Sequence, residues 1–161
     1  MVEIEKPRIT CVDSVEDPSY GKYVVEPLER GYGTTIGNSL RRILLSSLPG
    51  AAVFSIKVDG VYHEFTTIPG VREDVSMIIL QLKQLIMKIE DDEVYNLQIS
   101  ANGPCTVTAG DIICPAQVEI LNKDLEIAHL EKDATLEMEL KAKNGRGYVG
   151  SDVNKQANQG N

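Results

Sequence analysis

Apolar residues recur along the chain with two different periods, which predict short strands and two helices. Apolar runs at residues 8–15 and 20–27 flank an acidic segment, 16–19, that contains the proline and serine of a turn, so we expect two strands joined there. A period of two over residues 52–58 precedes Asp59-Gly60 and the run 61–65. Because Asp-Gly suits the positive φ angles of a type I′ turn, these residues predict a β-hairpin.

Residues 36–48 have the spacing of an amphipathic helix. Gly31 and Gly33 break regular structure before it, and Thr34 and Thr35 offer side-chain oxygens to cap its start. Pro49-Gly50 is expected to end it. Its apolar face would suffice to hold the helix on its own core, and consists of Ile36, Leu40, Ile43 and Leu44.

A second helix is predicted after Pro69-Gly70. Glu73 and Asp74 are expected in its first turn, where negative charge favours the positive end of the helix dipole. A long apolar stripe predicts that the helix packs against a sheet, and it comprises Val71, Val75, Ile78, Ile79, Leu82, Leu85 and Ile86.

The C-terminal half is predicted to be mostly β, which makes the fold class α+β. Alternation at residues 85–89 favours a strand that turns at Asp91-Asp92 and returns through 94–99 as a hairpin. Further strands are expected at 105–108, 117–121, 125–129 and 136–142. After Val149 the residues are polar and without apolar period, so 151–161 are expected to form a disordered tail.

Composition narrows the function classes. The net charge of -8 opposes non-specific attraction to phosphate backbones, so direct nucleic-acid binding is disfavoured. The three widely spaced cysteines favour a reducing compartment, and the sequence holds no long apolar run that could span a membrane. A cytoplasmic location is therefore expected. A steep, salt-dependent affinity for DNA would instead support the alternative that the chain is a nucleic-acid-binding module.

Candidate catalytic chemistry is sparse. His63 is interpreted as a hydrogen-bonded histidine on a packed strand face, and Cys105 and Cys114 lack the spacing of a metal site. Gly31-Tyr32-Gly33 is interpreted as a turn before a helix, not as a nucleotide loop. We therefore predict no catalytic residues, no metal and no cofactor. The alternative of a small cytosolic enzyme that uses a cysteine, His63 or His129 stays open.

The side of the first helix opposite its apolar face carries Asn38, Arg41, Arg42 and Leu45. Asn38, Arg42 and Leu45 are four and three residues apart and share a face. Arginine beside an apolar anchor is typical of an interface hot spot. From these residues alone, two interpretations stay open: a solvated face and a partner-binding surface.

A longer motif favours the second interpretation. The run VEPLERGYGTTIGNSLRRILLSS at residues 25–47 closely resembles the signature of the alpha subunit of bacterial DNA-directed RNA polymerase. Further matches are DGVYHEF at 59–65, GVRED at 70–74, TAGD at 108–111 and GRGYV at 145–149. The resemblance covers about residues 4–150.

The resemblance implies a partial dimerisation subdomain with an inserted, mostly β subdomain: residues 1–50 would begin the former and 51–150 would form the latter. It implies a non-catalytic scaffold that forms a homodimer with a second alpha subunit and recruits the beta and beta-prime subunits. Arg42 and Leu45 match positions that bind beta, with Asn38 and Arg41 as neighbours, and Lys83 matches a position linked to beta-prime. The face of Ile36, Leu40, Ile43 and Leu44 would serve core and alpha–alpha packing. Since family members continue beyond the GRGYV segment, the chain is expected to be a fragment.

Overall fold

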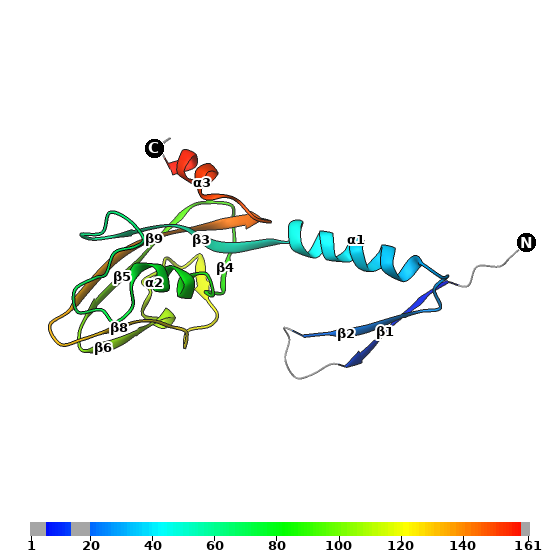
Figure 1. Cartoon of the computed structure of the whole chain (residues 1–161), viewed down its shortest axis with the longest axis horizontal. Helices are drawn as coiled ribbons and strands as arrows, with labels where there is room; N and C mark the ends of the chain where they lie inside the picture. Colours follow the sequence, from blue (N-terminus) through cyan, green and yellow to red (C-terminus); the bar gives the residue numbers. More distant parts are fainter. Residues whose placement is uncertain (1–5, 14–19, 159–161) are drawn as a thin grey trace, which may run out of the picture. The chain divides into compact units, whose positions relative to one another are not determined.

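The computed structural model describes residues 6–13 and 20–158, which divide between two compact units (Figure 1). Unit 1 is Met1–Ser47 and unit 2 is Leu48–Asn161. Both helices and antiparallel strands are present, so the predicted α+β class is confirmed. Among the described residues, no helix is long and apolar enough to cross a membrane.

Unit 1 consists of a two-stranded ribbon and one helix. Strands β1 (Arg8–Asp13) and β2 (Lys22–Glu26) pair antiparallel, with Ile9 opposite Val25 and an irregularity between Cys11 and Asp13. The two predicted strands are confirmed, and the predicted turn at 16–19 lies outside the described residues. The helix α1 (Tyr32–Ser46) begins earlier than its apolar period indicated.

The ends of α1 differ from the prediction. Gly31 is the N-cap residue and has a left-handed φ of 94°, which glycine adopts without the steric cost of a side chain. The cap carries no side-chain hydrogen bond, so the predicted threonine cap is wrong. The helix ends at Ser46, and Pro49-Gly50 already belongs to the next strand.

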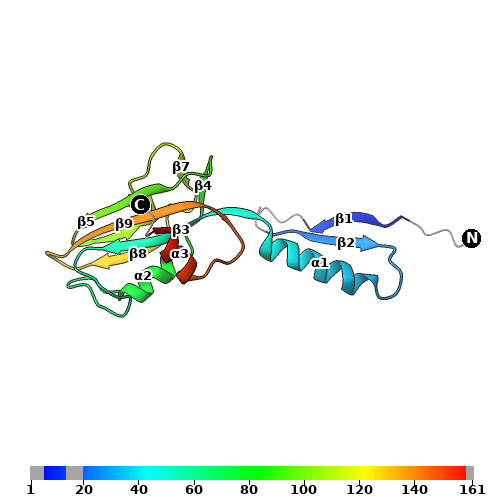
Figure 2. The ribbon, with the colours of Figure 1, turned by 90° about the horizontal axis from the view of Figure 1, so that it is seen from above.

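Unit 2 contains a five-stranded antiparallel sheet, a two-stranded sheet and two short helices, the first of which lies beside the strands (Figure 2). The order of the larger sheet is β5-β9-β3-β4-β7, and β6 pairs with β8. The strands are β3 (Pro49–Val58), β4 (Met87–Ile89), β5 (Tyr95–Asn102), β6 (Cys105–Thr108), β7 (Val118–Ile120), β8 (Glu126–Leu130) and β9 (Thr135–Arg146). A 3-10 turn, Ala109–Asp111, follows β6.

The alternation of side chains in β9 builds the core of unit 2. Leu136, Met138, Leu140 and Ala142 are buried, whereas Glu139 and Lys141 between them are exposed, because successive side chains of a strand point to opposite faces. Every buried apolar side chain in the described part of the chain lies between Val58 and Ala142. The hydrophobic core therefore belongs to unit 2.

Helix α2 (Val75–Leu82) is shorter than predicted, and its sequence explains where it begins. Asp74 is the N-cap, and its carboxylate accepts a 2.7 Å hydrogen bond from the Met77 amide. Glu73 and Asp74 thus precede the helix instead of lying in its first turn. Val75, Ile78 and Leu82 are buried, so the predicted core face is confirmed at these positions, while Ile86 is exposed.

Two predicted hairpins are wrong. Gly60 has the positive φ of 73° that a turn requires, but residues 61–65 form a loop and β3 pairs with β9 and β4. Likewise, β4 pairs with β3 and β7 and not with β5. Instead, β9 supplies partners to both β3 and β5 along most of its length.

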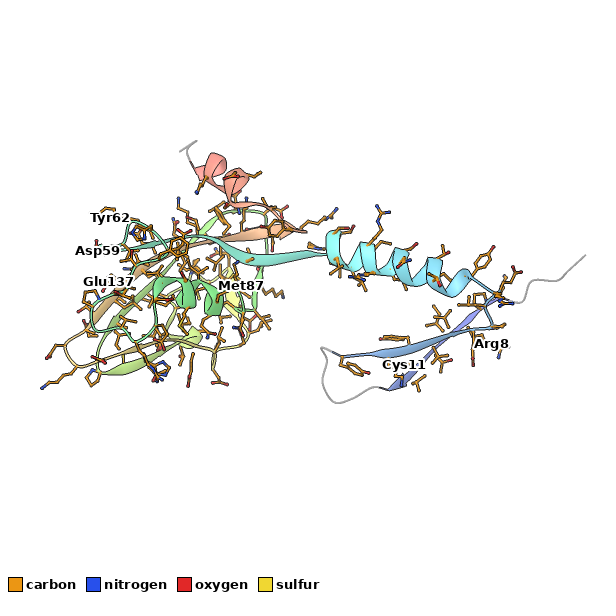
Figure 3. The ribbon with its side chains drawn as sticks, in the orientation of Figure 1. Arg8, Cys11, Asp59, Tyr62, Met87 and Glu137 are labelled. Atoms are coloured by element: carbon orange, nitrogen blue, oxygen red, sulfur yellow. The ribbon has the colours of Figure 1, made fainter. Side chains whose placement is uncertain are left out.

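Two further expectations are corrected. His63 is exposed in the loop after β3, where its Nδ1 lies 3.0 Å from the Thr66 hydroxyl, and it is not on a packed strand face. Figure 3 shows the neighbouring Asp59 and Tyr62 in the same region. Disorder was expected over residues 151–161, but Ser151–Asn158 form a helix, α3, and residues 159–161 lie outside the described residues.

Candidate functional site

Helix α1 carries the residues that the sequence marks as a candidate partner-binding surface. Its backbone is regular through Ser46, and two serine side chains bond back to the preceding turn. The Ser39 hydroxyl donates to the Thr35 carbonyl at 2.8 Å, and the Ser46 hydroxyl donates to the Arg42 carbonyl at 2.6 Å. These bonds satisfy the hydroxyl groups locally, so the exposed surface of α1 is dominated by its aliphatic and charged side chains.

The apolar face of α1 is open to solvent in the chain. None of the residues of α1 is buried. Leu40 is 52% exposed, Ile43 53% and Leu44 60%, while Ile36 is half-buried. Because α1 has no buried residue, the role of this face in core and alpha–alpha packing stays a prediction. Covering the exposed half of each side chain would gain roughly 1 kcal/mol, which makes the face typical of a surface that a partner covers.

The opposite side of α1 carries the residues of mixed character. Asn38, Arg41 and Arg42 are exposed, and Leu45 is 70% exposed. In the part of the chain that the structure describes, neither arginine forms an ion pair. Two unpaired guanidinium groups beside an exposed leucine combine charge, planar hydrogen-bond donors and apolar area, which suits recognition of a protein surface.

Lys83 lies in the other unit. It is the C-cap residue of α2, and its amide donates to the Ile79 carbonyl at 3.0 Å. Its side chain is exposed, as are Met77 and Leu80 on the outer side of the same helix. The family resemblance pointed to Lys83 but not to Met77 or Leu80. The apolar stripe of the predicted helix identifies only the residues that face the sheet, and these two residues lie outside it.

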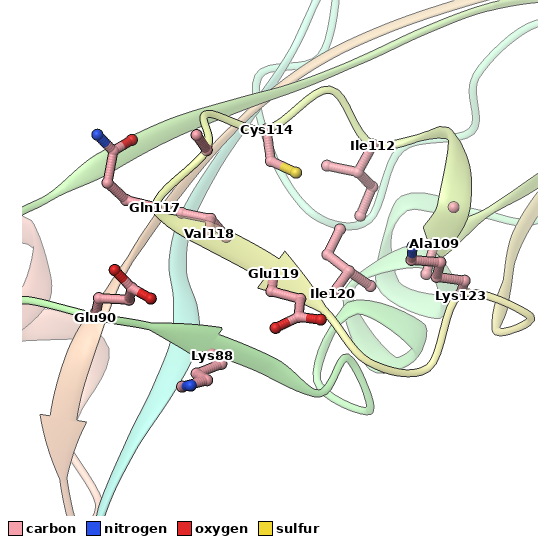
Figure 4. Close-up of a pocket in the computed structure, with 12 residues that line it drawn as sticks. Lys88, Glu90, Ala109, Ile112, Cys114, Gln117, Val118, Glu119, Ile120 and Lys123 are labelled. Atoms are coloured by element: carbon pink, nitrogen blue, oxygen red, sulfur yellow. The ribbon is translucent and has the colours of Figure 1, made fainter.

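The residues considered for catalysis are not brought together. A pocket of about 350 Å³ lies beside β4 and β7 and is lined by Lys88, Glu90, Glu119 and the exposed Cys114 (Figure 4). Its described lining includes neither histidine, so the thiol and imidazole of a cysteine enzyme do not meet there. Among the described residues, no group of three or more His, Cys, Asp or Glu side chains could hold a metal ion.

Sequence patterns did not point to the best-defined cluster of titratable groups. The Glu73 carboxylate contacts His129 through the backbone amide and through the ring, each at 2.7 Å. These residues are far apart in the sequence and no motif joins them. The pairing of β8 with the segment before α2 brings them together.

Comparison with known proteins identifies the family. Residues 56–161 match the family described as the RNA polymerase Rpb3/RpoA insert domain. The chain belongs to this family. It is also 60% identical over 159 residues to the DNA-directed RNA polymerase subunit alpha of Desulfitobacterium hafniense, strain DSM 10664 / DCB-2. The alpha subunits of Alkaliphilus metalliredigens and Desulforudis audaxviator are 58% and 59% identical over 157 and 158 residues.

The matches cover nearly all of this chain but only part of each relative. They span 99% of the chain for the Desulfitobacterium protein and 98% for the other two, and 50% of each relative. The chain thus spans about half the length of the curated relatives that it matches. These matches confirm the resemblance to the alpha subunit of bacterial RNA polymerase that the segment RGYGTTIGNSLRR indicated.

Proposed function

We propose that the chain acts as a non-catalytic assembly scaffold, the alpha subunit, of a bacterial DNA-directed RNA polymerase in the cytoplasm. In this role it belongs to a nucleotidyltransferase without supplying catalytic residues, a cofactor or a nucleic-acid contact of its own. Residues 1–50 begin the dimerisation subdomain and residues 51–150 form the inserted β-rich subdomain. The observation that carries the proposal is helix α1, which has two chemically different exposed faces and no buried residue.

The two faces are assigned to two partners. The aliphatic face, with Ile36, Leu40, Ile43 and Leu44, packs against a second alpha subunit. Its support is the apolar area left in water, which a homodimer would bury without needing charge complementarity. The other face, with Asn38, Arg41, Arg42 and Leu45, binds the beta subunit.

Lys83 on α2 is assigned to the beta-prime subunit. Support comes from its exposure at the C-terminal end of α2 and from the exposed Met77 and Leu80 beside it. A lysine next to apolar side chains offers a charge together with area to bury. The assignment is separate from that of α1, because Lys83 lies in the other unit.

The test is a co-purification that scores each partner separately. A tagged copy of the chain is expressed with an untagged copy and with the beta subunit. Arg42→Ala is expected to lose beta while retaining the second copy, and Leu44→Asp is expected to lose the second copy. Arg146→Ala, an exposed arginine at the end of β9, is the matched control and should retain both.

A circular-dichroism melt of each variant separates binding from folding. Because Arg42 is exposed, its replacement should change the free energy of unfolding by no more than about 0.5 kcal/mol. If Arg42→Ala retains beta as well as the control does, the assignment of this face is wrong. If it lowers the melting temperature by many degrees, Arg42 has a structural role instead.

A further inference from the structure

Strand β8 has one edge that no strand of the sheet covers. Its other edge pairs with β6, where Thr106 lies opposite His129. Along the uncovered edge runs the segment 70–74, which leads into α2. The Glu131 amide donates to the Gly70 carbonyl at 2.8 Å, and the Arg72 amide donates to the His129 carbonyl at 3.0 Å. The segment therefore continues the hydrogen bonding of the sheet for two bonds.

The next bond of this ladder is made by a side chain. The Glu73 Oε2 accepts from the His129 amide at 2.7 Å, and the Glu73 Oε1 lies 2.7 Å from the His129 Nδ1. An ionised carboxylate carries no proton, so Nδ1 must be the donor. One carboxylate thus binds the backbone and the ring of the same residue, which fixes the histidine ring and the segment together.

The surroundings make the charge of Glu73 important. Its side chain is only 14% exposed. Burial raises the pKa of Glu73, but the two hydrogen bonds from His129 and the attraction of its ring outweigh burial, so the pKa is lowered overall. The other charged groups nearby are Glu126, whose Oε2 lies 3.6 Å from the His129 Nε2, and Arg72 and Asp74 beside Glu73 in the segment. Thr106, opposite on β6, carries no charge.

We propose that Glu73 and His129 form an acid-sensitive latch, which fastens the segment 70–74 to the open edge of β8 and releases it when Glu73 is protonated. A neutral carboxylic acid has lost its negative charge and carries a proton on one oxygen, so it accepts far more weakly from the two N–H groups of His129. Both hydrogen bonds then weaken together, next to a carboxyl group that is largely buried, and the contact loses stability. The latch is a property of unit 2 and does not rest on the proposed function.

The direction of the pH effect follows from the lowered pKa. The stabilisation is fully present above the ordinary glutamate value of about 4.5 and is lost as the pH falls through the lower value of the folded chain. The segment ends at Asp74, the N-cap of α2. Release of the latch therefore loosens the start of α2 before the sheets themselves unfold.

The test is an NMR titration of the 161-residue chain. The 13C shift of the Glu73 carboxyl reports its protonation, and amide exchange at Arg72 and Glu131 reports whether the segment stays bound to β8. Exchange protection at both amides is expected to fall roughly tenfold as the Glu73 carboxyl titrates. Glu73→Gln should show the lower protection already at neutral pH and should lose the pH dependence.

Glu126→Gln is the matched control, because it removes a charge near the same ring without touching the carboxylate that binds the amide. It should leave the acid transition at Arg72 and Glu131 in place. An acid transition that persists unchanged in Glu73→Gln overturns the latch. If Glu73→Gln does not fold, the unaltered chain still tests the proposal. Exchange protection at the Arg72 and Glu131 amides that stays constant while the Glu73 carboxyl titrates would overturn it.

Discussion

Leu140 offers the sharpest test of where the stability of the chain resides. The residue lies in the middle of β9, is 0% exposed, and stands between Ile56 of β3 and Leu97 of β5 in the sheet register. Leu140→Ala removes three carbon atoms from this enclosed place. At roughly 0.8 kcal/mol for each buried carbon, the lost transfer energy is about 2.4 kcal/mol.

The cavity left behind increases the loss. Leu140 belongs to a central strand with partners on both sides, so the surrounding backbone has little freedom to collapse into the space. Leucine-to-alanine changes at such sites cost about 2–5 kcal/mol in total, and we expect about 4 kcal/mol here. The matched control is Leu45→Ala on α1, where 70% exposure limits the change to about 0.5 kcal/mol.

Urea unfolding at 25 °C, followed by circular dichroism, measures both variants against the unaltered chain. The slope of the free energy with urea should stay constant, so that the shift in midpoint reports stability. A loss below about 1 kcal/mol for Leu140→Ala would refute the packing argument. A loss for Leu45→Ala as large as that for Leu140→Ala would show that α1 has a core of its own.

Two further predictions concern polar contacts within unit 2. The Asn144 side-chain amide donates to the Ile89 carbonyl at 3.1 Å and to the Asp91 carbonyl at 2.6 Å, so Asn144→Ala should cost about 1–2 kcal/mol in the same urea assay, and an unchanged midpoint would contradict this. The hydrogen bond from the Tyr95 hydroxyl to Asp91, helped by burial and nearby carboxylates, raises the pKa of Tyr95 to about 12. Its stabilisation is present below the ordinary value of 10 and is lost as the pH rises through 12. An absorbance titration should show a tyrosine that ionises near pH 12, and Asp91→Asn should return the pKa of Tyr95 toward 10. A transition that does not move in Asp91→Asn would contradict the assignment.

Features that depend on neighbouring residues could be predicted from the sequence. The alternation of Leu136, Met138, Leu140 and Ala142 predicts a half-buried strand, and the structure contains one. The apolar period of α2 likewise predicts the buried Val75, Ile78 and Leu82. In both cases the spacing of the apolar residues predicts which side chains face the core.

Features that depend on distant residues could not be predicted. Asp59-Gly60 does form a turn, but the partner of β3 is β9, which lies far along the chain, and not residues 61–65. The contact between Glu73 and His129 has the same origin. For α1, the period correctly separates an apolar side from a mixed one, yet it carries no information on whether the covering surface belongs to this chain or to another.

The strand order also sets the sequence of events during synthesis. Ile56 of β3 finds its partner in Leu140 of β9, and Tyr95 of β5 finds Ala142 of the same strand. Until β9 has left the ribosome, β3 and β5 therefore have unpaired edges, and their apolar side chains remain available to other chains. Contacts between residues so distant in sequence form slowly, because a long loop must close first. A nascent chain that pauses before β9 would expose an incomplete sheet. Synthesis of β9 is therefore the step that protects unit 2 from aggregation.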